Sequence, residues 1–250
     1  MTSLSVNVNK IALLRNSRGR DFPKLVNFVE RLVNLGVKGI TVHPRPDERH
    51  ITRQDVTDIS VFLKLYSDVE FNIEGYPSED FMALVSQASP TQCTLVPDDP
   101  RQLTSDHGWD VAGNKKLLKD RVHRLKDIGV RSSLFFDPVP ERVAEVVSVG
   151  ADRIELYTEE YASHFGLESD QRIFEKYEAT AAMATSLGIG VNAGHDLDLH
   201  NLRRFLDIPD ILEVSIGHAL VVECLLQGLE PVIEQYLAIT AGQESESHYY

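Results

Sequence analysis

The sequence predicts a single-domain α/β fold, a (β/α)8 barrel over residues 1–242, with residues 243–250 as a flexible tail. Three observations predict it: short apolar segments alternate with longer amphipathic ones, the alternation repeats eight times, and no linker interrupts it. Strands that alternate with helices are typical of parallel sheets. Eight such units in 250 residues favour a closed barrel. A doubly wound open sheet is the alternative, but the Gly-x-Gly-x-x-Gly signature is absent after the first strand.

Hydrophobic spacing and glycine positions place the individual elements. Two apolar sets recur at helical spacing, namely Leu25, Phe28, Val29 and Leu32, and Leu118, Val122, Leu125 and Ile128. Four helical segments are followed by a glycine suited to a left-handed C-cap, namely Gly36, Gly129, Gly150 and Gly188. The predicted strands cover residues 4–9, 38–43, 69–74, 92–96, 131–136, 152–157, 189–193 and 211–216, and the predicted helices cover residues 22–35, 53–66, 78–88, 114–128, 139–149, 170–187, 198–205 and 218–240.

Composition excludes several classes of protein. Acidic residues outnumber basic ones 38 to 25, so a nucleic-acid partner is disfavoured and an anionic substrate would need a local cationic pocket. No segment approaches the roughly 18 apolar residues of a membrane span, and the first residues lack signal-peptide character, so we expect a cytoplasmic protein without a membrane partner. Cys93 and Cys224 are far apart in apolar surroundings, which favours buried free thiols over a disulfide or a metal site.

Polar residues collect where the predicted strands end, which is where barrel enzymes carry their catalytic groups. His43, Glu74 and His195 end the second, third and seventh strands, and Glu155 lies within the sixth between apolar neighbours. We expect barrel closure to bring these four side chains to one rim. Histidine with glutamate suits proton transfer near neutral pH. A two-histidine, two-carboxylate metal site is the alternative, although no motif such as His-Glu-x-x-His occurs.

Two segments are candidate phosphate sites. The loops after strands seven and eight carry Gly194 and Gly217, and such loops commonly bind phosphate in barrels, although a tight turn would also favour glycine. A cationic group near the first two strands is a second candidate, because arginine holds phosphate bidentately. The members of this group are Arg15, Arg18, Arg45, Arg49 and His50. Surface ion pairing with Asp47 and Glu48 is the alternative for Arg49 and, less so, for Arg45.

Seven motifs, in order from about residue 4 to about residue 240, resemble the pyridoxine 5'-phosphate synthase family. Together they are highly specific, because a chance match across all eight units is implausible. The motifs are Leu14-Arg15-Asn16-Ser17-Arg18-Gly19, Gly39-Ile40-Thr41-Val42-His43-Pro44-Arg45, Arg49-His50-Ile51, Asn72-Ile73-Glu74, Leu95-Val96-Pro97, Val191-Asn192-Ala193-Gly194-His195 and Ile216-Gly217-His218-Ala219.

The resemblance implies a transferase-class enzyme that assembles as a homo-octamer and uses no metal or organic cofactor. Its reaction would condense 1-deoxy-D-xylulose 5-phosphate with 3-amino-2-oxopropyl phosphate to pyridoxine 5'-phosphate, phosphate and water. His43 and Glu74 would be general bases, His195 a proton donor, and Glu155 a carboxylate that stabilises a cationic transition state or intermediate. Asn7 and Arg18 would contact the amino-ketone phosphate, Asn9, Lys10, Arg45, His50 and Thr104 the sugar phosphate, and Asp196, Gly217 and His218 would belong to the phosphate loops.

Two departures from the family pattern concern sugar-phosphate binding. Many members carry Asp-His where this chain has Asn9 and Lys10, and glycine is frequent where Asp196 follows His195. A carboxylate beside a phosphate loop is unfavourable unless it points away. Two other functions stay open from the residues alone: an isomerase or aldolase acting on one phosphosugar, and a non-catalytic protein that binds phosphorylated ligands.

Overall fold

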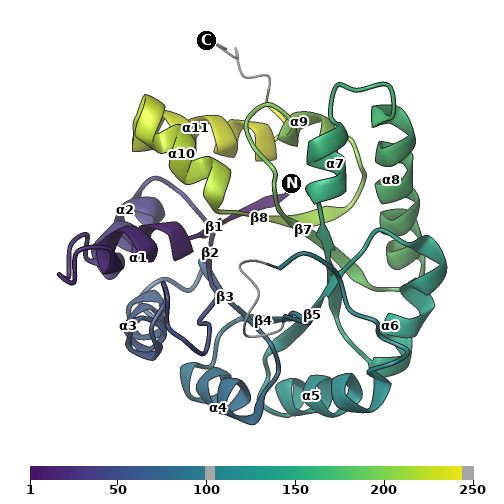
Figure 1. Cartoon of the computed structure of the whole chain (residues 1–250), viewed down its shortest axis with the longest axis horizontal. Helices are drawn as coiled ribbons and strands as arrows, with labels where there is room; N and C mark the ends of the chain where they lie inside the picture. The colour runs from purple at the N-terminus through teal and green to yellow at the C-terminus, as the bar shows by residue number, and fades with distance from the viewer. Residues whose placement is uncertain (99–104, 244–250) are drawn as a thin grey trace.

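The computed structural model describes residues 1–98 and 105–243. Within these residues, eight parallel strands close into a TIM-type barrel in the order of the sequence, so β1 pairs with both β2 and β8. Figure 1 shows the strands at the centre, with the helices around them. The (β/α)8 fold predicted from the sequence is confirmed. The strands are β1 Ser3–Asn7, β2 Gly39–Val42, β3 Glu70–Gly75, β4 Gln92–Leu95, β5 Arg131–Phe136, β6 Arg153–Tyr157, β7 Gly190–His195 and β8 Ile211–Ile216.

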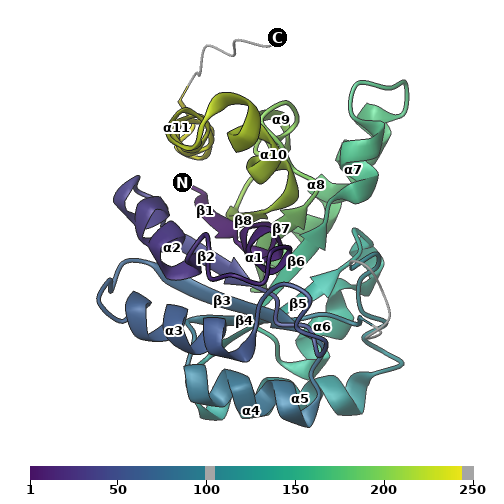
Figure 2. The ribbon, with the colours of Figure 1, turned by 60° about the vertical axis from the view of Figure 1, so that its left-hand side comes forward.

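Helices follow the strands and cover the outside of the barrel. They are α1 Asn9–Asn16, α2 Leu25–Asn34, α3 Arg53–Leu63, α4 Glu79–Ala88, α5 Lys115–Asp127, α6 Val143–Val149 with a 3-10 turn η1 at Pro140–Arg142 before it, α7 Glu159–His164, α8 Asp170–Ser186, α9 Leu202–Phe205, α10 His218–Gln227 and α11 Leu229–Thr240. Helix α11 packs against β1, so the two ends of the chain meet on one side of the barrel (Figure 2). No helix in the described ranges is long and apolar enough to cross a bilayer.

The four glycine C-caps are confirmed by the backbone. Gly36, Gly129, Gly150 and Gly188 have φ angles of 98°, 71°, 79° and 75°, a region that other L-residues seldom adopt. Each glycine ends a helix and lets the chain turn back toward the next strand. The repeated unit of helix, glycine and strand that was predicted from the sequence is therefore present in the structure at these four positions.

Several predicted boundaries were wrong. The first strand ends at Asn7 rather than at residue 9, because α1 begins at once and buries Ile11 and Ala12. Helices α1 and α7 were not predicted, since each is short and its apolar spacing covers barely two turns. The predicted helix 218–240 is two helices, because Gly228 adopts a φ of 99° between them. Only the last four residues of the predicted helix 198–205 are helical, and of the predicted tail only Gln243 is described.

The interior of the barrel is polar. Gln92 on β4 donates a hydrogen bond to Glu213 on β8 (3.3 Å) and accepts one from Asn192 on β7 (3.2 Å). Thr94 on β4 donates to Glu155 on β6 (3.1 Å). These strands are not neighbours, so the bonds cross the space inside the barrel. Alternation along each strand therefore points polar side chains inward and apolar ones outward.

The hydrophobic core lies between the barrel and the helices. Val6, Ile40, Ile73, Ile154 and Val214 are fully buried on the outer face of their strands and belong to one apolar cluster with the helices. Many (β/α)8 barrels instead fill their interior with branched apolar side chains. Here the stabilising apolar contacts surround the barrel, which leaves its interior available for titratable groups.

A buried ion pair fixes the segment that follows β2. The Arg15 guanidinium on α1 pairs with the Asp55 carboxylate on α3, with one N–O distance of 2.8 Å. Arg15 also donates to the His50 carbonyl oxygen (3.2 Å), and Asn16 donates to the same oxygen (2.8 Å). Asp55 completes a capping box with Thr52 at the start of α3. Arg15, one member of the predicted cationic group, therefore positions the His50 loop and does not face an anion site.

The two cysteines are free thiols, as expected, but only Cys93 is buried. Cys224 on α10 is half-buried.

Candidate active site

A cavity of about 610 Å³ opens at the C-terminal end of the barrel. Of the side chains predicted to form the site, all but two line it. The exceptions are Arg18, which lies exposed beyond α1, and Thr104, which is outside the described residues. The predicted residues that line the cavity are Asn7, Asn9, Lys10, His43, Arg45, His50, Glu74, Glu155, His195, Asp196, Gly217 and His218.

His43 and Glu74 face one another at the ends of β2 and β3. Nδ1 of His43 lies 3.8 Å from Oε2 of Glu74, and both side chains are largely buried. Burial, followed by the nearby Arg45 cation, lowers the pKa of His43 well below its usual value. Burial, together with repulsion from Glu155, raises the pKa of Glu74 well above its usual value. The pair is therefore a neutral imidazole beside a carboxyl group that retains its proton to higher pH.

Glu155 lies deeper in the barrel, with little to balance its charge. Its Oε2 accepts the hydrogen bond from Thr94, and burial and the proximity of Glu213 raise its pKa to about 8. Gly194 on the neighbouring strand leaves room for this carboxylate, since a Cβ there would lie 2.5 Å from Oε1 of Glu155. The glycine before His195 is therefore required by the packing of Glu155 as well as by any ligand.

Asn7 and Asn9 connect the end of β1 to the ends of β2 and β3. Oδ1 of Asn7 accepts a hydrogen bond from the Asn9 amide (3.0 Å), and its Nδ2 donates to Glu74 (3.4 Å). Oδ1 of Asn9 accepts a hydrogen bond from the backbone amide of His43 (2.9 Å). An asparagine oxygen provides this contact as well as an aspartate oxygen would. Asn9, where many family members carry aspartate, therefore still provides the acceptor that holds the His43 backbone in place.

His195 ends β7 with an unusual backbone. Its φ is 102°, a region that costs of order 1–3 kcal/mol for a residue other than glycine and is found at functional sites. The ring packs edge-on against Tyr157, with centroids 5.2 Å apart, and Nδ1 lies 2.5 Å from the Asp196 carboxylate. The sequence predicted that a carboxylate at residue 196 would repel a bound phosphate unless it pointed away. Asp196 does line the cavity, but its pairing with His195 reduces this repulsion.

Cationic and neutral donors gather on the side of the cavity beneath the β2–α3 loop. Lys10, Arg45, Arg49 and His50 all line it, and Arg49 also pairs with Asp47 (2.7 Å), as the surface alternative proposed. Burial and the positive charge of Arg45 lower the pKa of His50 to about 4, so its ring is neutral at pH 7. Nδ1 of His50 accepts a hydrogen bond from the Ile51 amide (2.9 Å). The ring proton is therefore on Nε2, where it can be donated.

The N-terminus of α10, which follows β8, forms another part of the cavity wall. This helix begins at His218, with Gly217 as the preceding N-cap residue. The first amides of a helix have no acceptor within the helix, and the helix dipole favours an anion there. A Cβ at residue 217 would lie 3.0 Å from Cβ of Asn7, so glycine keeps this strand end close to the first. Ser215 on β8 also lines the cavity.

Sequence reasoning missed several side chains. Asp98, Ser105, Phe135 and Ser215 lie in or beside the cavity, and Glu213 lies in the barrel near Glu155. The alternation of β8 contained a signal for Glu213 and Ser215, because both fall at inward positions. Asp98 had a weaker signal, as an acidic residue directly after a strand. Among residues 1–98 and 105–243, no three His, Cys, Asp or Glu side chains form a group able to hold a metal ion.

The raised pKa of Glu155 predicts how its replacement affects stability. A pKa of about 8 in the folded chain exceeds the ordinary 4.5. The folded state therefore binds more protons between these values, and the free energy of unfolding falls as pH rises through them. We expect Glu155→Gln to raise Tm at pH 9 by several degrees and by much less at pH 5, measured by calorimetry. Exposed Glu178→Gln is the control and should show no such pH dependence. An equal effect of Glu155→Gln at both pH values would contradict a raised pKa.

Comparisons with known proteins agree with this geometry. Residues 4–242 match the family model described as "Pyridoxal phosphate biosynthesis protein PdxJ". The pyridoxine 5'-phosphate synthase of Leptospira biflexa is 47% identical, with 98% of this chain and 100% of the relative covered. That of Bacteroides thetaiotaomicron is 49% identical over 94% of this chain and 98% of the relative.

Solved structures with little sequence identity share the fold. The 3-hexulose-6-phosphate synthase of Salmonella typhimurium has a TM-score of 0.64 at 14% identity, with 97% of this chain and 100% of that chain covered. The tryptophan synthase alpha-subunit of Pyrococcus furiosus, as a mutant, has a TM-score of 0.63 at 12% identity, with 96% of this chain and 98% of that chain covered. The near-complete match to one family model, together with relatives almost half identical over their whole length, shows that this chain is an enzyme of the pyridoxine 5'-phosphate synthase family.

Proposed function

We propose that the enzyme condenses 1-deoxy-D-xylulose 5-phosphate with 3-amino-2-oxopropyl phosphate, giving pyridoxine 5'-phosphate, phosphate and water by acid–base catalysis. The observation that carries this proposal is one cavity lined by four titratable side chains, His43, Glu74, Glu155 and His195, and by two different features suited to phosphate. An isomerase or aldolase acting on one small phosphosugar would have no use for both phosphate features.

The two phosphates are assigned to two different parts of the cavity wall. Arg45, His50 and Lys10 supply guanidinium, imidazole and ammonium donors for the sugar phosphate. The N-terminus of α10 with Gly217 and His218, near Asn7, supplies backbone amides for the amino-ketone phosphate. The net charge of the chain is −13, so these donors are a local exception that gives the cavity its affinity for anions.

The four titratable groups suit the successive proton transfers of such a condensation. The amine attacks a ketone, water leaves, and phosphate is eliminated before the ring closes, and each step moves a proton. Neutral His43 is able to accept a proton, and burial brings the pKa of Glu74 closer to the pH range in which a carboxyl group both gives and takes protons. His195, whose Nδ1 lies beside the Asp196 carboxylate, would donate a proton when its ring is protonated. Glu155 would balance a cationic intermediate, which in turn would favour its ionised form.

Aromatic side chains form part of the cavity wall. Phe135 lines the cavity and packs against Tyr157, with ring centroids 5.3 Å apart, and Tyr157 packs against His195. An apolar wall of this kind suits a flat pyridine ring and limits the access of water to reactive enamine intermediates. The direction of ring closure would follow from which substrate phosphate binds to the Arg45 group and which binds to the N-terminus of α10.

Incubation of the purified enzyme with both substrates tests the function. We expect pyridoxine 5'-phosphate, identified by mass spectrometry, only when both substrates are present, because each phosphate feature takes one of them. Turnover of either substrate alone would favour the isomerase or aldolase. Binding without turnover would favour the non-catalytic function, and either outcome would contradict the proposal.

Replacement of Glu74 tests the acid–base mechanism. Glu74→Gln keeps the shape and the hydrogen-bonding capacity of the side chain, so the fold should be retained, but it removes the group that exchanges the proton. We expect kcat to fall by about 10²-fold or more. Steady-state kinetics and circular dichroism measure the two effects, and exposed Glu178→Gln is the matched control. Turnover equal to wild type would remove Glu74 from the mechanism.

We propose further that the chain acts as a homo-oligomer, an octamer by resemblance to the family. Large apolar side chains are exposed on α1 and on α10, which pack against each other, and on the segment between α1 and α2. Leu13 of this surface also lines the cavity, so a partner there would lie beside the substrates. The exposed side chains are Leu13, Leu14, Phe22, Val222, Leu225 and Leu226.

Light scattering on the purified chain tests the oligomer. We expect a mass of eight chains, and Leu225→Asp with Leu226→Asp should reduce it, because charged side chains oppose burial of this surface. Leu65→Asp, at an exposed apolar side chain on a different part of the surface, is the control. A monomeric wild type at micromolar concentration would contradict the proposal.

A further inference from the structure

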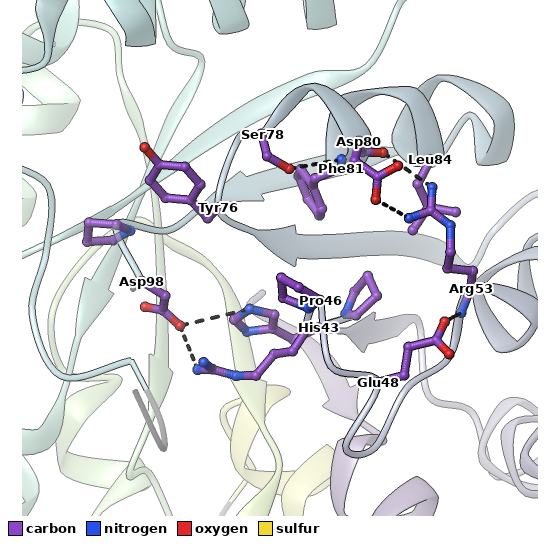
Figure 3. A pocket seen from close by; sticks show the side chains of 13 residues that line it. His43, Pro46, Glu48, Arg53, Tyr76, Ser78, Asp80, Phe81, Leu84 and Asp98 are labelled. Atoms are coloured by element: carbon purple, nitrogen blue, oxygen red, sulfur yellow. Dashed lines mark hydrogen bonds and ion pairs between the residues drawn. The ribbon is translucent and has the colours of Figure 1, made fainter. Parts of the chain in front are cut away.

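A second cavity lies behind the first. It has a volume of about 470 Å³ and lies between the segments that follow β2, β3 and β4 (Figure 3). His43 and Arg45 line both cavities, so they form the partition between them. Asp98 lines the second cavity and not the first. It can therefore influence the substrate site only through His43 and Arg45.

Asp98 contacts both members of this partition. Its Oδ2 accepts a hydrogen bond from Arg45 (2.6 Å) and one from Ser105 (2.8 Å), and lies 3.9 Å from Nε2 of His43. Figure 3 shows its carboxylate directed at the His43 ring. Only 4% of Asp98 is exposed, and within the described residues its Oδ1 has no hydrogen-bond partner. Burying an incompletely satisfied carboxylate is costly, so its position here calls for a compensating function.

The carboxylate determines how the His43 ring can be protonated. A neutral imidazole carries one N–H and one lone pair. Oδ2 of Asp98 lies 3.9 Å from Nε2 and Oε2 of Glu74 lies 3.8 Å from Nδ1, so the two carboxyl groups act on opposite nitrogens of the ring. Burial raises the pKa of both, well above its usual value for Glu74, whereas Ser105 and Arg45 counteract the rise in the pKa of Asp98. The negative charge therefore lies on the Asp98 side and favours the form with its proton on Nε2 and its lone pair on Nδ1. The other charged or titratable groups that influence the ring are Arg45, Arg49 and His50 of the following loop. Oδ2 of Asp98 is the carboxylate oxygen that faces Nε2, at a distance longer than a hydrogen bond.

The same carboxylate competes with substrate for Arg45. The Arg45 guanidinium donates to Asp98, so this carboxylate partly balances its charge. A phosphate that binds Arg45 would draw it toward the substrate cavity and weaken its hold on Asp98. The negative charge of Asp98 would then act more strongly on His43, the base. Phosphate binding and base strength are thus connected through one buried side chain.

We propose that Asp98 is a positioning residue that fixes the Nε2–H form of His43 and connects this base to the phosphate-binding Arg45. The inference rests on the function proposed above and goes beyond it by assigning a role to a residue outside the substrate cavity. Asp98→Asn keeps the shape of the side chain but replaces its charge and one acceptor with a donor. Arg45 then loses a charge-assisted hydrogen bond, which is about twice as strong as a neutral one, and His43 loses the electrostatic attraction of the carboxylate.

Three measurements test the role of Asp98. For Asp98→Asn we expect kcat to fall by about 10-fold or more, because His43 loses its orientation. The Kd of 1-deoxy-D-xylulose 5-phosphate, measured by calorimetry, should be unchanged or tighter, because Arg45 no longer has a competing anion. Asp98→Glu should restore part of kcat. Asp80→Asn is the matched control, since Asp80 lines the same cavity but pairs with Arg53, and its kcat should equal that of wild type.

The outcomes separate the two proposals. A general loss of structure would weaken Kd together with kcat, and that result, or an unchanged kcat in Asp98→Asn, would overturn the inference. If the wild-type enzyme forms no pyridoxine 5'-phosphate, the proposed function fails. Crystal structures of the wild type and of Asp98→Asn then test the role of Asp98 independently of turnover. We expect His43 and Arg45 to change rotamer in Asp98→Asn, and retention of both wild-type rotamers would contradict a positioning role.

Discussion

Burial of carboxylates inside the barrel is the constraint on which the site depends. Glu74, Glu155 and Glu213 lie within one polar interior, and burial raises the pKa of each. Arg153 lies near Glu213 (4.0 Å), and the pKa of Glu213 rises only to about 7. Glu155, with a threonine hydroxyl as its hydrogen-bond donor, has the higher pKa of about 8. The depth of each carboxylate and its nearest donor therefore set the pH range in which it exchanges protons.

This polar interior is possible because stability is supplied elsewhere. Burial of apolar surface is the dominant favourable contribution to folding, and in this chain it lies between the strands and the helices. Strand alternation allows both arrangements at once, because each strand directs one set of side chains into the barrel and the other set outward. Substitutions inside the barrel should consequently change activity and pH dependence more than they change the fold. Substitutions such as Ile73→Ala on the outer face should do the reverse.

Much of the fold and the upper rim of the site followed from local sequence patterns. The positive-φ glycines mark the helix ends, and a polar side chain directly after an apolar strand falls at the rim of any parallel barrel. For that reason the positions of His43, Glu74 and His195 were predictable once the fold was known. The remainder depends on contacts between segments far apart in sequence. The Arg15–Asp55 pair joins residues 40 positions apart, and nothing local to Arg15 distinguishes it from Arg18 as an anion ligand.

Asp98 illustrates the same limit for the chemistry. In the sequence it is one of two consecutive aspartates after a strand, and only the fold places it between His43 and Arg45. This arrangement shows how the site is assembled, because the proposed base and the proposed phosphate ligand both follow β2 and share one acidic neighbour from the segment after β4. The ends of β2 and β4, which flank β3 in the barrel, therefore supply the imidazole, the guanidinium and the carboxylate that contacts both. Because the carboxylate lies behind this partition, it can act on both partners without occupying the space in which the substrates must meet.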